Sequence, residues 1–473
     1  MQRIFTELVV RLFFLSWSII KFLGPDPMKL IQNPTPISHF WYRVEMYFSV
    51  YLLHIQARLR EKAARRISNI RLNAMLKEAQ LIPYWNERLT KPGYVHPGPL
   101  TDLEPITKNI LRNIPLNKLS SEPRLKQITW RRTSGTSGEP FVWGFDIPTL
   151  IKSMTPAYMV GLLQRASVPL SKRPWVIAIN MPHGQEVTPC HPVRIDLKFT
   201  TSTNRKRERS DLEVILKTLE KTGRRRILYG YPSELLIFAQ ALSQHDLIFE
   251  VEAVITTGQH LEPGAREAIQ TLLKTRVHSF YTTRELGPVA YECVKQNDVF
   301  HICSERIIVE FFNEELTQVQ KDEGVLVFTA LDQGAMPLIR YAIGDTAQLK
   351  KPEGVKCICG LRSASIIFSG RTMDYLTLKD GTRIPARRIR SALLSSQFIN
   401  KIRRFQAKEG HPGTLEITVD TYSTKPFDPS EESILIKKLK QEIDAKLDVT
   451  FIYNSLPSMG KFKDFIPHTK DDQ

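Results

Sequence analysis

Thr133-Ser134-Gly135-Thr136-Ser137-Gly138-Glu139-Pro140 is the most specific local stretch of the sequence, and it follows residues 127–131, which have the pattern of a β-strand. Glycines have no Cβ, so a loop of glycines and hydroxyl residues lets backbone N–H groups approach phosphate oxygens closely. The loop lacks the Gly-Lys-Ser/Thr ending of a P-loop and the glycine spacing of a dinucleotide-binding fold. It therefore predicts a phosphate-binding loop of another kind, although such a stretch is also typical of a plain surface loop.

Around this loop, short β-branched runs alternate with longer amphipathic segments, the runs being 175–179, 226–229, 251–256 and 325–329. Such alternation is typical of α/β layering. After residue 370 the pattern changes, and residues 415–419 and 431–447 have the patterns of a further strand and helix. Because 473 residues exceed the size of one core, we expect several domains. They are an N-terminal helical region (1–96), a large α/β domain (97–369) and a small C-terminal α+β domain (370–473).

The charge and the cysteine content indicate the kind of partner and the cellular compartment. Lys and Arg number 66 against 49 Asp and Glu, and the formal charge of +17 favours anionic partners such as nucleotides. Five cysteines in a chain of this length argue against a disulfide framework and favour a reducing compartment. Hydrophobic residues make up 42% of the chain, which excludes a disordered protein.

Residues 3–23 predict an amphipathic helix, with polar side chains on one stripe and a wide apolar face. A charge-free run of about 18 residues is lacking, and no small-residue cleavage site follows, so spanning and secretion are disfavoured. The helix either docks on its own fold or lies on a membrane surface. We therefore expect a cytoplasmic protein, with peripheral membrane contact through residues 3–23 as the alternative.

Five further motifs follow the loop in order, namely Gly-Tyr-Pro-Ser at 230–233, Thr-Thr-Gly-Gln at 256–259, Tyr281 with Glu285, 337–341 with Gly344-Asp345, and Gly370-Arg371. Together they resemble the adenylate-forming superfamily of acyl-CoA synthetases, and within it the phenylacetate-CoA ligase branch and its CapK-like capsule-biosynthesis relatives. The resemblance runs from about residue 105 to residue 461. It implies a large N-terminal domain and a mobile C-terminal lid. The implied reaction activates a carboxylic acid with ATP to acyl-AMP and transfers the acyl group to an acceptor, by default coenzyme A.

The resemblance also implies roles for single residues. The 133–138 loop would wrap the β- and γ-phosphates, Tyr281 would lie against the adenine, Glu285 would help hold Mg²⁺, and Asp345 would accept hydrogen bonds from the ribose hydroxyls. The implied ATP-binding residues are Thr133, Ser134, Gly135, Thr136, Ser137, Gly138, Thr257, Gly258, Tyr281, Glu285, Asp345 and Arg371.

The implied catalytic residues are Lys461, Glu285 and Thr136. Positive charge is needed at the α-phosphate, because charge builds on its oxygens as the carboxylate attacks and pyrophosphate leaves. Lys461 follows Gly460 and resembles the C-terminal lysine of the family, and Lys463 is a rival for this role.

A second cluster concerns metal. Cys357 and Cys359 form a tight Cys-x-Cys pair, and Cys293 and His301 lie in a segment expected nearby. These four ligands suit a tetrahedral, structural Zn²⁺. Cys303 is an alternative ligand, and buried free thiols are the alternative to any metal site.

Four residues depart from the pattern of the family. Glu139 stands where many relatives have lysine, Gln259 where an acid is common, Arg284 where a small hydroxyl residue is common, and Met373 where a second acidic residue is common. Because of these four residues, the nucleotide affinity, the shape of the acyl pocket and the movement at the domain hinge need not follow those of the family.

Two other functions stay open. One keeps the fold and places the ligase in capsular or cell-surface polysaccharide biosynthesis, and the other is a catalytically inactive binding protein. Nucleic acid is not the expected partner, because basic faces of this kind are mostly solvated. The sequence identifies neither the acid nor the oligomeric state.

Overall fold

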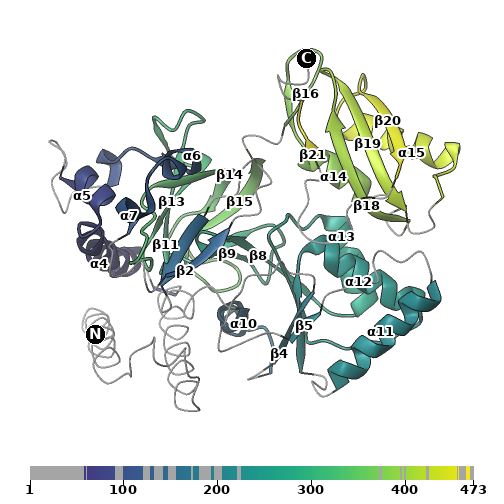
Figure 1. The fold of residues 1–473 in the computed structure, drawn as a ribbon, viewed down its shortest axis with the longest axis horizontal. Coiled ribbons are helices and arrows are strands. Elements are labelled where there is room, and N and C mark those ends of the chain that lie inside the picture. Colours follow the sequence, from purple (N-terminus) through teal and green to yellow (C-terminus); the bar gives the residue numbers. More distant parts are fainter. Residues whose placement is uncertain are drawn as a thin grey trace. The chain divides into compact units, whose positions relative to one another are not determined.

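The computed structural model describes residues 58–59, 61–90, 100–120, 128–132, 142–146, 156–171, 174–179, 193–195, 205–220, 225–371, 375–394, 397–398, 401–421, 425–454, 456 and 465–468 (Figure 1). The chain forms two compact units. Unit 1 comprises residues 1–169, 184–191 and 280–368, and unit 2 comprises residues 170–183, 192–279 and 369–473. The helix predicted at 3–23 lies outside the described residues. Within them, no helix combines the length and apolar character needed to cross a bilayer.

Unit 1 places short helices beside a sheet. The helices are α4 (Glu61–Ala79), α5 (Pro83–Leu89), the 3-10 turn η1 (Leu100–Asp102), α6 (Lys108–Arg112), α7 (Leu116–Leu119) and α10 (Pro156–Arg165). α5 begins with Pro83, whose missing N–H is not needed in a first helical turn. The α5 residue Trp85 is 1% exposed and donates its indole N–H to the carbonyl of Pro337 at 3.1 Å. The helices α4, α5, α6 and α7 thus share one apolar core with the strands.

The strands of unit 1 are mainly antiparallel. They are β1 (Ile106–Thr107), β2 (Ile128–Arg132), β3 (Val142–Asp146), β9 (Gly287–Glu292), β10 (Phe300–Ile302), β11 (Ile307–Phe312), β12 (Val319–Gln320), β13 (Glu323–Ala330), β14 (Tyr341–Lys351) and β15 (Ser365–Arg371). The sheet runs β12-β11-β13-β14-β15-β10-β9, with β1 parallel to β14 and with β2 and β3 as a separate hairpin. β8 (Val277–Thr283) begins in unit 2 and pairs with β9 through its unit 1 residues.

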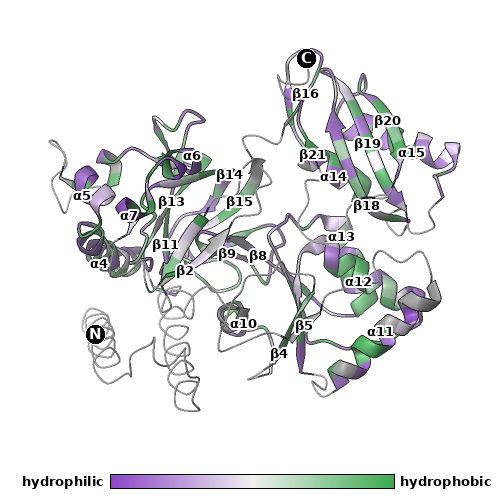
Figure 2. Ribbon diagram, viewed as in Figure 1, coloured by the Kyte–Doolittle hydropathy of each residue, from purple (hydrophilic) through white to green (hydrophobic). Residues whose placement is uncertain are grey.

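Unit 2 opens with a parallel βα layer. Its strands β4 (Trp175–Ile179), β5 (Val193–Ile195), β6 (Arg226–Gly230) and β7 (Ala253–Thr257) are ordered β7-β6-β4-β5 and pair in parallel. The helices α11 (Arg205–Leu219), α12 (Pro232–Gln244) and α13 (Pro263–Leu273) belong to the same layer. Most of α12 is buried, and Figure 2 colours this helix mainly as hydrophobic. The predicted α/β fold class is confirmed, and the predicted strand at 175–179 coincides with β4.

The C-terminal part of unit 2 is an α+β layer with its own apolar core. It contains the hairpin β16 (Tyr375–Thr377) and β17 (Arg383–Pro385), the helices α14 (Arg387–Leu394) and α15 (Pro429–Glu442), and a sheet ordered β20-β19-β18-β21 from β18 (Ile402–Glu409), β19 (Thr414–Thr421), β20 (Asp448–Tyr453) and β21 (Phe465–Ile466). Asp428 donates its N–H to the Glu431 carboxylate at 3.1 Å, which caps α15. The helix predicted over 431–447 ends earlier, because the chain turns toward β20. The predicted domain boundaries remain predictions.

A buried ion pair fastens this C-terminal layer to the βα layer. Arg404 on β18 pairs with Glu234 in the first turn of α12, and their side chains are 1% and 0% exposed. Taking two charges out of water is costly, and only close pairing repays it. The position of β18 against α12 therefore depends on this contact.

We predict that Arg404→Met lowers the free energy of unfolding of unit 2 by about 3–5 kcal/mol, because Glu234 is left charged and buried. The double variant Arg404→Met/Glu234→Met recovers most of that loss. The matched control is Lys401→Met, which removes a pair with Glu431 in which the lysine is 53% exposed, and we expect it to cost much less, because solvent screens an exposed pair. Chemical denaturation measures all three, and similar losses for both single variants would contradict the prediction.

Candidate active site

Glu285 lies in the turn between β8 and β9, and its side chain is almost buried. The Tyr341 hydroxyl lies 3.4 Å from its Oε1 as a donor, and the Lys108 ammonium is 3.7 Å from the same oxygen. Lys108 is the first residue of α6, and Tyr341 is the first residue of β14. Three elements of unit 1 therefore converge on one carboxylate.

Tyr281 and Asp345 form a second pair in unit 1. The Tyr281 hydroxyl donates a hydrogen bond to Oδ2 of Asp345, which joins β8 to β14. The Tyr281 ring packs against Phe368 with 4.2 Å between ring centroids and faces Phe328 at 6.2 Å. The result is an aromatic wall with a carboxylate at its edge.

β14 connects the two groups, because it carries both Tyr341 and Asp345. Burial raises the pKa of the Tyr341 hydroxyl well above its ordinary value, and the negative charge of Glu285 raises it further. The contact of Tyr341 with Glu285 and the hydrogen bond between Tyr281 and Asp345 are therefore both made by one strand.

Arg340 holds the start of β14 in place. Its guanidinium is 2% exposed and binds both carboxylate oxygens of Glu310, at 3.0 and 2.8 Å, and the carbonyl of Leu103. Its backbone has φ +50°, a left-handed conformation that a non-glycine residue adopts only when its surroundings fix it. The Arg340 carbonyl accepts the N–H of Ile106 at 2.8 Å, which begins the pairing of β1 with β14.

Two predicted motifs meet in unit 2. Gly258 follows β7 with φ +74°, and a Cβ placed there would lie 2.5 Å from Cε1 of Tyr231. The Ser233 hydroxyl donates to Oε1 of Gln259 at 3.0 Å. Residues 230–233 and 256–259 are therefore in contact with each other. Thr257, beside Gly258, is buried.

The remaining predicted residues are placed less fully. Thr133, Ser134, Gly135, Thr136, Ser137, Gly138, Glu139, Met373, Lys461 and Lys463 lie outside the described residues. Arg371 ends β15, in unit 2. Unit 1 brings together Tyr281, Glu285 and Asp345, and unit 2 brings together Thr257 and Gly258.

Sequence reasoning missed two groups beside Glu285. Tyr341 lies inside the quoted 337–341 motif, so its position gave a signal, although its side-chain role did not follow from it. Lys108 gave no signal, because it is one of many lysines and lies far from Glu285 in the chain.

The predicted metal ligands lie together in unit 1. One ligand atom from each of Cys293, His301, Cys357 and Cys359 falls within 4.8 Å of the others. The sulfurs of Cys293 and Cys357 are 3.8 Å apart, and Sγ of Cys359 is 3.2 Å from Nε2 of His301. Two thiolates on a tetrahedral Zn²⁺ with bonds of about 2.3 Å lie about 3.8 Å apart. The donor set therefore fits this metal.

The four ligands interact with one another. Hydrogen bonds from Cys359 and then from His301 lower the pKa of the Cys293 thiol, although burial opposes them, whereas the contact with Cys293 raises the pKa of Cys359. Nδ1 of His301 lies 3.3 Å from the Ser363 hydroxyl, a contact that orients the ring. Cys303 lies apart from the group, next to Tyr158, so the alternative ligand is not supported.

Comparison with known proteins relates the chain to carboxylate ligases. No family model matches. The sequence is 28% identical over 174 residues to a phenylacetate-coenzyme A ligase of Aromatoleum evansii, and 29% identical over 170 residues to one of Thermus thermophilus. These matches cover 35% and 34% of the chain, and the matched segment spans only 38% and 36% of the two relatives.

The fold is similar to a solved ligase over most of its length. A crystal structure of 2-hydroxyisobutyryl-CoA ligase in complex with R3-HIB-AMP superimposes with a TM-score of 0.66, covering 88% of this chain and 92% of that chain at 15% identity. At this identity the likeness concerns the fold alone.

We predict that Gly258→Ala destabilises unit 2 more than Gly381→Ala does. Both glycines have φ near +80°, at +74° and +84°, so each variant pays a backbone penalty of about 1 kcal/mol. Only Gly258→Ala also forces a Cβ into the Tyr231 ring, because the space around Gly381 is open. Thermal unfolding compares the two, and equal shifts in the unfolding temperature would refute the steric argument.

Proposed function

We propose that this chain, a member of the adenylate-forming superfamily, activates a carboxylic acid with ATP and passes the acyl group to coenzyme A. In the first reaction a carboxylate oxygen bonds to the α-phosphorus and pyrophosphate leaves, giving acyl-AMP. In the second reaction the thiolate sulfur of the acceptor bonds to the acyl carbon and AMP leaves. The proposal rests chiefly on one observation, which is that β14 carries both Asp345, bonded to Tyr281, and Tyr341, in contact with Glu285.

Asp345 and Tyr281 are proposed to bind the nucleoside. A carboxylate accepts several hydrogen bonds at once, so Asp345 is suited to a ribose with two neighbouring hydroxyls. The Tyr281 ring, backed by Phe368, offers a flat apolar surface for the adenine. The hydrogen bond between the two side chains fixes their separation in the unit.

Glu285 is proposed to help hold Mg²⁺ beside the triphosphate. Carboxylate oxygens are the protein ligands that Mg²⁺ prefers, and it keeps several waters and substrate phosphates as its other ligands. When bound, the ion neutralises charge on the phosphate oxygens. Lys108, whose ammonium lies 3.7 Å from Oε1 of Glu285, forms an ion pair with this carboxylate. The loop at 133–138 and Lys461 retain their predicted roles at the phosphates.

The identity of the acid and of the acceptor is the finer part of the proposal. Coenzyme A as the acceptor is supported by the two similar phenylacetate-coenzyme A ligases and by the similar fold of 2-hydroxyisobutyryl-CoA ligase. Their names make phenylacetate and 2-hydroxyisobutyrate the first acids to test.

We predict that the protein exchanges pyrophosphate into ATP in the presence of a suitable acid, and that Glu285→Gln and Asp345→Asn each reduce this exchange by about 100-fold or more. Each variant removes one negative charge with little change of shape. Radiolabelled pyrophosphate and a panel of carboxylic acids measure the exchange.

The control for this experiment is Glu323→Gln, an equal change of charge at an exposed residue of β13, for which we expect unchanged exchange. Absence of exchange across a broad panel, with ATP binding demonstrated, would refute the enzyme and favour a binding protein on this fold.

We also propose a structural Zn²⁺ held by Cys293, His301, Cys357 and Cys359. The site joins the loop after β9, the strand β10 and the loop that follows β14. Four protein ligands leave no open position for a reacting water, so the role is to fasten loops rather than to catalyse.

We predict one Zn²⁺ per chain by plasma mass spectrometry, and its loss in Cys357→Ser and Cys359→Ser together with a lower unfolding temperature. Cys303→Ser is the matched control, since this buried thiol lies outside the group, and it should retain the metal. A metal-free wild-type protein that binds no added Zn²⁺ would contradict the proposal.

A further inference from the structure

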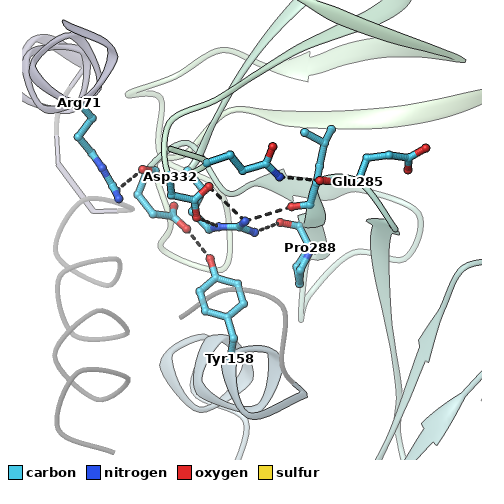
Figure 3. Close-up of polar contacts among 9 residues, drawn as sticks. Arg71, Tyr158, Glu285, Pro288 and Asp332 are labelled. Carbon is cyan, nitrogen blue, oxygen red and sulfur yellow. Dashed lines mark hydrogen bonds and ion pairs between the residues drawn. The ribbon is translucent and has the colours of Figure 1, made fainter. Parts of the chain in front are cut away.

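A buried polar network lies behind the turn that carries Glu285 (Figure 3). The Gln333 side-chain amide donates to the Glu285 carbonyl at 2.5 Å. The Arg306 guanidinium donates to the carbonyls of Leu286 and Pro288, at 3.0 and 2.7 Å. Side chains from elsewhere in unit 1 thus hold two carbonyls of the turn and one at the start of β9.

The donors of this network are themselves fixed. The Asp332 carboxylate binds Arg306 at 2.7 Å, and the charge of Asp332 raises the Arg306 pKa although burial opposes it. Asp332 and Gln333 are adjacent in the chain, so one segment supplies both the counter-charge and the second donor. The guanidinium side chain is 3% exposed, which leaves it little freedom to turn away.

Two helices reach the same network through Glu305, the neighbour of Arg306. The Tyr158 hydroxyl of α10 donates to the Glu305 carboxylate at 2.6 Å, and the Arg71 guanidinium of α4 donates to the Glu305 carbonyl. Burial raises the pKa of Glu305. The turn of Glu285 is therefore connected to α4 and α10 through these hydrogen bonds and the peptide bond between Glu305 and Arg306.

Gln333 is not explained by packing alone. Its amide oxygen is buried and accepts no hydrogen bond within the described part of the chain. A buried polar atom without a partner destabilises a fold, and an apolar side chain of the same volume would avoid that loss. Its amide nitrogen donates to the backbone carbonyl of Glu285. Figure 3 shows the Glu285 side chain directed to the opposite side of the turn.

We propose that Gln333, together with the Arg306 and Asp332 pair, positions Glu285 for metal binding. The three residues hold the backbone of the turn, so the Glu285 carboxylate is presented at one place instead of sampling several. They act through the backbone of the turn and are positioning residues. The inference rests on the proposed role of Glu285 at Mg²⁺.

The test compares Gln333→Met with a matched variant, Gln270→Met. Methionine keeps the volume of glutamine and removes its hydrogen bonds. Gln270 also binds a backbone group through its side-chain amide, accepting the N–H of Val277 at 3.1 Å, but it belongs to α13 of unit 2. We expect Gln333→Met to weaken Mn²⁺ binding in the presence of ATP by about tenfold, the effect usual for a residue that orients a metal ligand. Gln270→Met should leave that binding unchanged.

A double-mutant cycle separates positioning from general destabilisation. Mn²⁺ binding is measured by electron paramagnetic resonance in the wild type, Gln333→Met, Glu285→Gln and the combined variant. If Gln333 acts through Glu285, the second substitution adds no further loss in the Glu285→Gln background. Full additivity of the two losses, or equal weakening by Gln270→Met, would overturn the proposal.

This experiment also distinguishes the two levels of inference. Mn²⁺ binding that depends on Gln333 in a protein without pyrophosphate exchange would refute the proposed reaction and support the positioning role. Normal exchange with a Mn²⁺ affinity unaffected by Gln333→Met would support the reaction and overturn the positioning role.

Discussion

The buried guanidinium of Arg340 is the contact on which the candidate site depends. It ties Glu310 of β11 and the carbonyl of Leu103 to the residue that precedes β14. Because β14 starts one residue later, this contact helps to fix the position of Tyr341 and, four residues on, that of Asp345. Arg340 has a left-handed backbone, a costly conformation for a non-glycine residue that these contacts help to stabilise. The candidate site is thus anchored by a charge that is buried away from solvent.

The fold and much of the site were predictable from local pattern. β-branched runs between amphipathic segments indicated α/β layering, and the predicted strands at 175–179 and 226–229 agree with β4 and β6 to within one residue. The ordered motifs indicated the adenylate-forming superfamily, in agreement with the sequence similarity to phenylacetate-coenzyme A ligases, and the fold is similar to that of a solved CoA ligase. Sequence motifs were informative here because short, chemically unusual segments such as residues 337–345 can be recognised without knowing which residues they contact in the fold. The membership in the capsule-biosynthesis branch stays a prediction.

Long-range polar contacts were not predictable. Arg306 and Asp332 are ordinary charged residues in the sequence, and nothing local indicates that they face each other beneath the Glu285 turn. The same holds for Lys108, since its contact with Glu285 depends on how α6 packs. The helix predicted to continue to residue 447 ends at Glu442 for a similar reason. The residues between Glu442 and Asp448 have a helical pattern, but from Asp448 onward the chain forms β20 and pairs with β19.

The Arg404–Glu234 pair has a consequence for how C-terminal layers can be exchanged between related proteins. A buried pair of opposite charges penalises every misaligned docking, because each misalignment leaves a charge without its counterpart. It therefore favours one packing of β18 against α12 over the alternatives, rather than stabilising all packings equally. A chimera that grafts a foreign C-terminal layer onto this chain would seat correctly only if the graft brings a guanidinium to the place of Arg404, whatever the apolar match of the two surfaces.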